Sequence, residues 1–222
     1  SKGAVKGILN GETRQKIKES SAVVEKIALA DKAVYGINTG FGPLCTTMIS
    51  ADDTRKLQEN ILKSHAVGVG TPIDDEISKI MLVLKLQALA KGYSGIQEAT
   101  LDRMIWHLEN DVIPVVPKQG SVGASGDLAP LSHLFLPLIG LGRVHYKGDI
   151  VATNVVLKEH GLSPIALSAK EGLALINGTQ FIAALGAEAL YRADLCAKQA
   201  DVVAGVSIEA LKGSNKAFDG RI

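Results

Sequence analysis

Helical spacing of apolar residues recurs along most of this chain and constrains its fold more than any other feature. Within residues 97–112, for example, Leu101, Ile105 and Leu108 lie on one helix face. Apolar residues that recur every three or four positions indicate amphipathic helices. We expect helices over residues 12–30, 54–67, 72–90, 97–112 and 178–211, with a further one starting at 128.

Segments that favour β-structure are few. RVHYKGDIV, residues 143–151, alternates around Lys147–Gly148 and is rich in β-forming residues. This pattern predicts a small hairpin. The expected fold class is therefore all-α, a helical bundle with one minor β-hairpin.

The charge balance argues against a nucleic-acid partner. With 24 basic and 23 acidic residues, the net charge is +1, and no basic block interrupts the chain. Binding to nucleic acid usually leaves a basic footprint in the sequence. We expect no apolar run to reach the length of a membrane span, since the longest candidate, residues 131–141, contains His133 and Pro137. We therefore expect neither a nucleic-acid nor a membrane partner.

The cysteines and histidines show no metal-ligand spacing. Cys45 and Cys196 are the only cysteines and lie far apart. Secreted disulfide scaffolds and zinc sites need denser, paired cysteines. We expect a reducing cytoplasmic location and no metal site.

The stretch GSVGASGDLAP, residues 120–130, does not fit the common glycine-loop motifs. A P-loop requires Lys and Ser or Thr after its last glycine, whereas Asp127 follows Gly126 here. The spacing G-x-x-G-x-x-G is not the dinucleotide fingerprint, and a nucleophile elbow needs G-x-S-x-G. The simplest structural interpretation is a helix connection in which Asp127 caps the helix that begins at Leu128.

The same loop has the composition for internal cyclisation. The unhindered amide nitrogen of Gly126 can attack the carbonyl carbon of Ala124 with loss of water. Ser125 can then lose its hydroxyl as a second water, which leaves an exocyclic methylene. The product would be an electrophile, a function that no unmodified side chain supplies.

Four segments together resemble the aromatic amino-acid ammonia-lyases. They are YGINTGFG at 35–42, LQENILKSHAVGVG at 57–70, GSVGASGDLAPLSH at 120–133 and EGLALINGTQ at 171–180. They occur in the order of the family and span most of the chain. The resemblance implies an all-α fold of the fumarase/aspartase-like ammonia-lyase type.

The resemblance also implies catalytic residues and a cofactor. Ala124, Ser125 and Gly126 would form 4-methylidene-imidazole-5-one (MIO) autocatalytically, with no external cofactor. Tyr35 would remove the β-proton of the substrate, which requires a lowered pKa. Asn177 would donate a hydrogen bond to the MIO ring oxygen, and we expect it to be buried.

Ser64 and His65 resemble the substrate-selecting pair of family members that act on histidine. Their presence implies elimination of ammonia from L-histidine to give trans-urocanate. Two alternatives stay open. One is a phenylalanine or tyrosine ammonia-lyase or an aminomutase, and the other is a non-catalytic helical assembly piece with an uncyclised loop.

Family members are about twice as long as this chain. We therefore expect residues 1–222 to be an N-terminal portion that carries the Tyr35 loop, the MIO loop and the start of the central bundle. The C-terminal half, with further substrate contacts, would be absent. The complete protein is expected to be a homotetramer, and the isolated portion is expected to be inactive.

Overall fold

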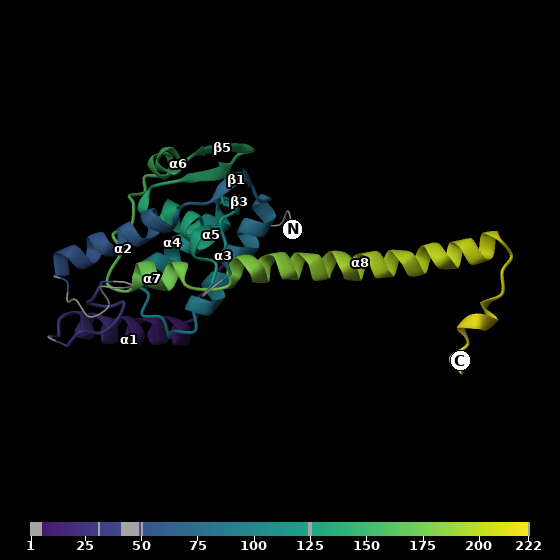
Figure 1. Ribbon diagram of the computed structural model, residues 1–222, viewed down its shortest axis with the longest axis horizontal. Coiled ribbons are helices and arrows are strands. Elements are labelled where there is room, and N and C mark those ends of the chain that lie inside the picture. Colours follow the sequence, from purple (N-terminus) through teal and green to yellow (C-terminus); the bar gives the residue numbers. More distant parts are fainter. Residues whose placement is uncertain (1–5, 31, 41–48, 50, 124–125, 222) are drawn as a thin grey trace. The chain divides into compact units, whose positions relative to one another are not determined.

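The computed structural model describes residues 6–30, 32–40, 49, 51–123 and 126–221. The chain divides into two compact units, Ser1–Ala184 and Leu185–Ile222. Figure 1 shows the order of their elements along the sequence. The final long helix, α8, begins in the first unit and ends in the second.

Helices dominate the described residues, which confirms the expected fold class. The α-helices are α1 (Gly11–Ala28), α2 (Ala51–His65), α3 (Asp75–Leu89), α4 (Glu98–Glu109), α5 (Leu128–Phe135), α6 (Thr153–Glu159), α7 (Glu171–Ile176) and α8 (Gln180–Ala210). Two 3-10 turns, η2 (Leu136–Ile139) and η3 (Asn215–Phe218), follow α5 and α8. The short helices α6 and α7 were not predicted from the sequence.

The predicted hairpin is present and belongs to a small three-stranded sheet. Strand β4 (Arg143–Tyr146) pairs antiparallel with β5 (Asp149–Ala152), and β2 (Ile113–Pro114) pairs with the other edge of β4. A separate pair joins β1 (Val69–Pro72) to β3 (Pro117–Gln119), with Val69 opposite Gln119. This second pair was not predicted, and it connects the end of α2 to the start of the glycine loop.

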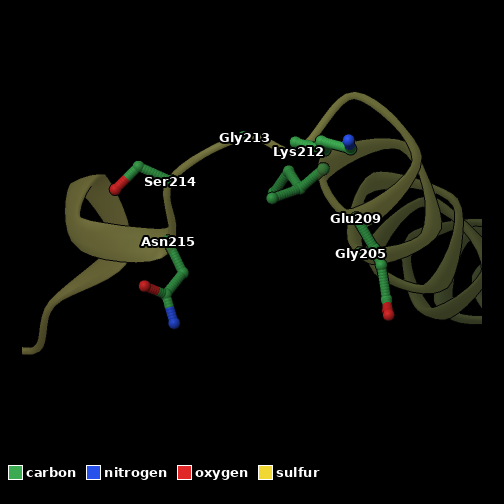
Figure 2. A pocket seen from close by; sticks show the side chains of 7 residues that line it. Gly205, Glu209, Lys212, Gly213, Ser214 and Asn215 are labelled. Atoms are coloured by element: carbon green, nitrogen blue, oxygen red, sulfur yellow. The ribbon is translucent and has the colours of Figure 1, made fainter.

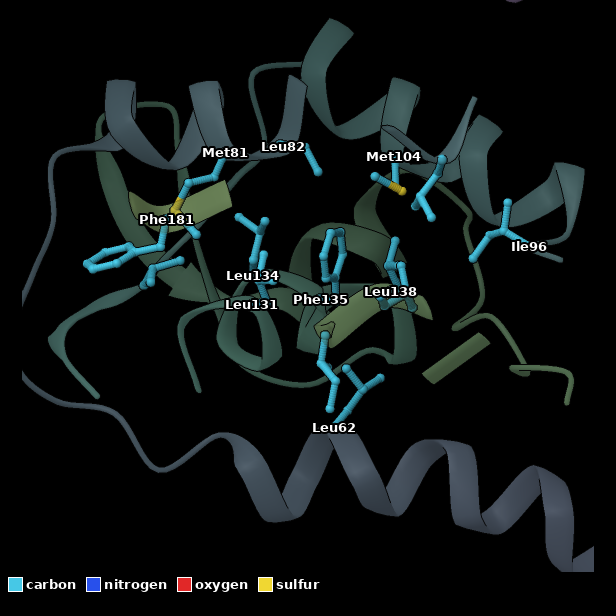
Figure 3. Packing of buried hydrophobic residues seen from close by; sticks show 14 of the residues in the cluster. Leu62, Met81, Leu82, Ile96, Met104, Leu131, Leu134, Phe135, Leu138 and Phe181 are labelled. Carbon is cyan, nitrogen blue, oxygen red and sulfur yellow. The ribbon is translucent and has the colours of Figure 1, made fainter. Parts of the chain in front are cut away.

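The core of the first unit is built around α5. Figure 3 shows Phe135 between Leu62 of α2 on one side and the helices carrying Leu82 and Met104 on the other. Phe135 is fully buried and belongs to one continuous apolar cluster. Because interiors are close-packed, this arrangement fixes α2, α5 and α7 against one another.

Helices α2 and α7 approach each other closely at Gly172. The Gly172 N–H donates to Gln58 Oε1 at 2.9 Å. A Cβ atom at this position would lie 2.5 Å from the Gln58 carbonyl oxygen. Only glycine fits there, so the helix that leads to Asn177 rests directly on the helix that ends at His65.

The second unit consists of most of α8 and the turn after it. Apolar side chains along this part of α8 are exposed, among them Leu190, Tyr191, Val202, Val203 and Val206. By length and composition, one stretch of the described residues, Glu171–Ala210, is long and apolar enough to cross a membrane. The expectation that no apolar segment reaches that length is therefore wrong, although core helices of soluble proteins pass the same test.

Candidate active site

The glycine loop ends at a position that only glycine can occupy. Gly126 has a φ of 139°, and a Cβ added there would lie 2.5 Å from the Gly178 carbonyl oxygen. The backbone of residue 126 therefore contacts the segment after α7 directly. Ala124 and Ser125, the other two predicted MIO precursors, lie outside the described residues.

Asp127 fixes this end of the loop, but not by capping α5. Its side chain makes no capping hydrogen bond to α5. Instead Oδ2 accepts from the backbone N–H groups of Phe181 at 3.0 Å and Ile182 at 3.1 Å, in the first turn of α8. The predicted cap is thus corrected. The carboxylate is completely buried and satisfies donors at the positive end of the much longer helix.

The two ends of the loop are also joined to each other. Ser121 Oγ donates to Asp127 Oδ1 at 2.8 Å, across the intervening five residues. The Asp127 N–H donates to Gly178 O at 2.7 Å. The two ends of loop 120–127 are thereby joined to each other, and its last residue is attached to the Asn177–Gly178 turn.

Asn177 is exposed, and the expectation of a buried side chain is wrong for this chain. Helix α7 ends at Ile176, and Asn177 follows with extended backbone angles, φ −85° and ψ 112°. This change of direction turns the side chain away from the apolar face of α7. Its backbone carbonyl faces the core, where it accepts from Lys85 Nζ at 2.8 Å.

Ser64 and His65 form the last residues of α2, as predicted for the histidine. His65 Nδ1 lies 2.9 Å from the Ile61 carbonyl oxygen and 3.1 Å from Ser64 Oγ. A carbonyl oxygen only accepts hydrogen bonds, so Nδ1 carries the proton. In the neutral form of the half-buried imidazole, this tautomer has Nε2 as the acceptor.

The segment after His65 packs against the glycine loop at Gly68. A Cβ on Gly120 would lie 3.0 Å from Gly68 Cα. The Gly68 N–H donates to His133 Nε2 at 2.9 Å, and His133 belongs to α5. The structure thus brings the His65 segment, loop 120–127 and the Asn177–Gly178 turn into one connected region.

Tyr35 lies in a turn that is held to the end of α1. The Asn38 side chain fixes this turn, because Nδ2 donates to the Ile27, Ala30 and Lys32 carbonyls. The Tyr35 side chain is 55% exposed. These hydrogen bonds attach the turn that carries Tyr35 to the end of α1 and the residues just after it.

Burial and hydrogen bonding account for the remaining histidines of the core. His107 Nδ1 donates to the Val112 carbonyl at 2.9 Å, and burial lowers the pKa of His107 to about 4. Burial likewise lowers the pKa of His133. Within the described ranges, no cluster of three or more His, Cys, Asp or Glu residues could hold a metal ion.

Sequence reasoning missed Ser121, His133 and Lys85 as residues of this region. Lys85 left a recognisable signal, since it is the only charged residue in the apolar run IMLVLKLQAL. Ser121 and His133 left none, because their roles depend on backbone groups that are distant in sequence. The contacts of all three became evident only from the structure.

Two surface hollows are lined by described residues other than those of this region. One of about 680 Å³ is lined by Gly205, Glu209 and Lys212 near the end of α8 (Figure 2). Another, of about 520 Å³, lies beside α1 and includes Ile37 and Tyr93. Neither is lined by His65, Gly126 or Asn177.

Comparison with known proteins identifies relatives over nearly the whole chain. The histidine ammonia-lyase of Halalkalibacterium halodurans is 46% identical over 211 residues, which cover 95% of this chain and 41% of that protein. The histidine ammonia-lyase of Bacillus cereus strain G9842 is 49% identical over 205 residues, covering 92% of this chain and 41% of that protein. The chain therefore spans about two fifths of the length of these relatives.

Solved structures show the same fold. The crystal structure of histidine ammonia-lyase from Trypanosoma cruzi matches with a TM-score of 0.90 at 40% identity, covering 98% of this chain and 42% of that chain. Tyrosine aminomutase from Streptomyces globisporus matches with a TM-score of 0.83 at 37% identity, covering 90% and 38%. The model of the family described as aromatic amino acid lyase matches residues 1–222. The chain belongs to the aromatic amino acid lyase family.

Proposed function

We propose that residues 1–222 are the N-terminal portion of an enzyme that eliminates ammonia from L-histidine to give trans-urocanate. The observation that carries this proposal is the connected region formed by loop 120–127, the His65 segment and the Asn177–Gly178 turn. The named relatives support histidine as the substrate.

The described residues fit an MIO group formed from Ala124, Ser125 and Gly126. A side chain cannot be accommodated at position 126, and glycine is also the residue whose amide nitrogen is least hindered for cyclisation. Asp127 and Ser121 hold the two ends of the loop together, which favours the tightly turned backbone that attack of the Gly126 nitrogen on the Ala124 carbonyl carbon requires. When formed, MIO supplies an electrophilic carbon that withdraws electrons from the substrate.

The remaining roles fall to side chains of this chain. Tyr35 accepts the β-proton, and the α-amino group departs as ammonia, so the substrate loses one proton and its amine. The exposed amide of Asn177 donates a hydrogen bond where negative charge develops. Hydrogen bonds of this kind stabilise charge more strongly at sites that exclude water. In the proposed full-length enzyme, further protein would cover the site.

His65 supports a preference for histidine. Its Nδ1 proton is directed to Ile61, so Nε2 can accept the N–H of a substrate imidazole. Phenylalanine has no such donor, and the tyrosine hydroxyl lies farther from its Cβ. A site built around a hydrogen bond discriminates strongly against analogues that cannot make it.

Substrate profiling of the full-length protein tests this proposal. We expect urocanate, followed by its near-ultraviolet absorbance, from L-histidine at a kcat/KM at least about tenfold above those for L-phenylalanine and L-tyrosine. His65→Phe should lower kcat/KM for L-histidine and so reduce the ratio of this kcat/KM to those for L-phenylalanine and L-tyrosine. A preference for tyrosine, or a β-amino acid product, would instead support the tyrosine aminomutases as the functional relatives.

Peptide mass tests the cofactor separately. Trypsin releases Gln119–Arg143 as one peptide. We expect it to be two waters lighter than its sequence in the full-length enzyme, and unmodified in Ser125→Ala. An unmodified wild-type peptide would contradict the MIO proposal even if the substrate assignment held.

We also propose a cytoplasmic homotetramer without a nucleic-acid or membrane partner. The exposed apolar side chains of α8 support association with further protein, since monomers rarely expose such surfaces. Cys196 is exposed and free, which suits a reducing compartment. Gel filtration of the full-length protein would test the tetramer, and cell fractionation would test the cytoplasmic location. Recovery of the protein in membranes would contradict that location.

A further inference from the structure

Lys85 is an unusual residue for the position it occupies. It lies on α3 with only 2% of its surface exposed, among residues of the apolar core. Within the described part of the chain, no acidic side chain forms an ion pair with it, and burial alone lowers its pKa to about 8. A buried, unpaired ammonium is unfavourable for stability, so an apolar residue would suit packing better.

The Lys85 ammonium contacts the backbone of the candidate site. Nζ donates to the Asn177 carbonyl oxygen at 2.8 Å. The next carbonyl, that of Gly178, accepts from the Asp127 N–H at 2.7 Å. Two successive carbonyls of one turn are therefore held, one by Lys85 and one by loop 120–127.

Both sides of this turn carry residues of the proposed reaction. The Asn177 side chain is exposed on one side, and the Gly126 backbone packs against Gly178 on the other. Rotation of the Asn177–Gly178 peptide would move the amide of Asn177 and remove the surface against which Gly126 is packed. The hydrogen bond from Lys85 opposes that rotation from inside the core.

We propose that Lys85 is a positioning residue, whose ammonium holds the Asn177–Gly178 turn against loop 120–127 and thereby orients Asn177. Its role in catalysis rests on the proposed function, whereas its hold on the turn does not. The two parts can therefore be measured separately.

Deamidation reports on the turn without reference to activity. In an Asn–Gly pair, the glycine nitrogen attacks the side-chain carbonyl carbon, ammonia leaves, and water opens the resulting ring to aspartate or isoaspartate. The backbone must rotate for this attack, so a held turn reacts slowly. The chain supplies an internal control, because Asn10–Gly11 is the other Asn–Gly pair and lies at the start of α1.

The experiment compares Lys85→Met and Lys85→Arg with wild type in the full-length protein. Tryptic peptides Glu171–Arg192 and Gly7–Arg14 report deamidation of the two pairs by mass over time. We expect Lys85→Met to deamidate at least about fivefold faster at Asn177 and at the wild-type rate at Asn10. Lys85→Arg retains a cation and should lie between wild type and Lys85→Met.

Kinetics of the same variants test the catalytic part. We expect Lys85→Met to lower kcat at least about tenfold with little change in KM, because a misplaced Asn177 donor affects the transition state more than substrate binding. Lys79→Met is the matched control on α3, since Lys79 pairs with the exposed Asp111 and should retain wild-type kinetics.

The outcomes separate the two proposals. An unchanged deamidation rate at Asn177 in Lys85→Met would overturn the positioning role, whatever the activity. Faster deamidation with unchanged kcat would confirm the hold on the turn and overturn its catalytic consequence. A wild-type enzyme that does not act on histidine would refute the proposed function, while the deamidation comparison would still decide the role of Lys85.

Discussion

Asp127 illustrates how a single residue can carry a different role from the one its neighbours suggest. It directly precedes α5, yet its carboxylate accepts hydrogen bonds from the first turn of α8 and from Ser121. The local sequence predicts only the nearer helix, because the second helix begins more than fifty residues later. Long-range partners of this kind cannot be inferred from spacing.

Removal of the Asp127 carboxylate should destabilise the protein. Asp127→Ala would leave the buried Phe181 N–H and the partly buried Ile182 N–H without this acceptor, at a cost of about 2 kcal/mol. We expect a clearly lower midpoint of thermal unfolding for Asp127→Ala, with Asp127→Asn between it and wild type. Equal midpoints of thermal unfolding for Asp127→Ala and wild type would contradict the role of Asp127 in capping the first turn of α8.

For Lys85 we expect the opposite effect on stability to that for Asp127: removal of its charge should not destabilise the protein. Its pKa falls from 10.5 to about 8 on folding, so the unfolded chain binds this proton more tightly. Below pH 8 the charge therefore opposes folding, by roughly 3 kcal/mol when the shift is converted at 1.4 kcal/mol per pH unit. This penalty decreases as the pH rises from 8 to 10.5 and is absent above that range.

Lys85→Met should consequently melt at or above the wild-type temperature at pH 7. The gain is smaller than the full penalty, because the Asn177 carbonyl loses its donor at a cost of about 1 kcal/mol. The advantage of the variant should decrease between pH 8 and 10. A variant that is less stable than wild type at pH 7 would show that Lys85 stabilises the core.

At the scale of elements, the long helices could be predicted from the sequence and the short pieces could not. α3 and α4 have apolar stripes, and their ends differ from prediction by only a few residues. β1 and β3 contain Gly or Pro and are largely exposed, so they show no alternation of apolar and polar residues. These strands nevertheless place the His65 segment beside loop 120–127, which explains why the sequence indicated site residues but not how they meet.

The connection between α2 and α5 can be tested at His133. His133 Nε2 accepts from the Gly68 backbone N–H, which requires a neutral imidazole. His133→Leu removes the acceptor and should raise KM for histidine by about three- to tenfold, equivalent to roughly 1 kcal/mol. His133→Gln places an amide oxygen near the same N–H and should retain most affinity. Equal KM values for His133→Leu and wild type would show that the hydrogen bond from Gly68 to His133 does not position the His65 segment.

At the scale of the whole molecule, the described chain holds the parts of a site without enclosing them. Asn177 and Tyr35 are exposed, and the relatives continue well beyond the matched region. Exposed apolar residues along α8 support the proposed association with further protein. The family and the all-α class could be predicted from sequence, whereas the exposure of Asn177 could not, because burial depends on which parts of the protein are present.

The isolated 222-residue chain should therefore be inactive and should associate. We expect no urocanate from L-histidine under conditions in which the full-length protein is active, and an apparent size by gel filtration that increases with concentration. Substitution of Val202 and Val206 by Ser should weaken this association. Activity of the isolated chain would contradict the view that the site needs further protein.

The attachment of Asp127 to α8 also sets an order of events during synthesis of the chain. The N–H groups that hold its carboxylate belong to residues 54 and 55 positions later in the chain. A ribosome that has just released the loop has not yet made them. The Asp127 carboxylate therefore lacks these two donors until the first turn of α8 has emerged and folded. If the proposed ring forms, we expect it to form only after that point, when the surrounding core can assemble.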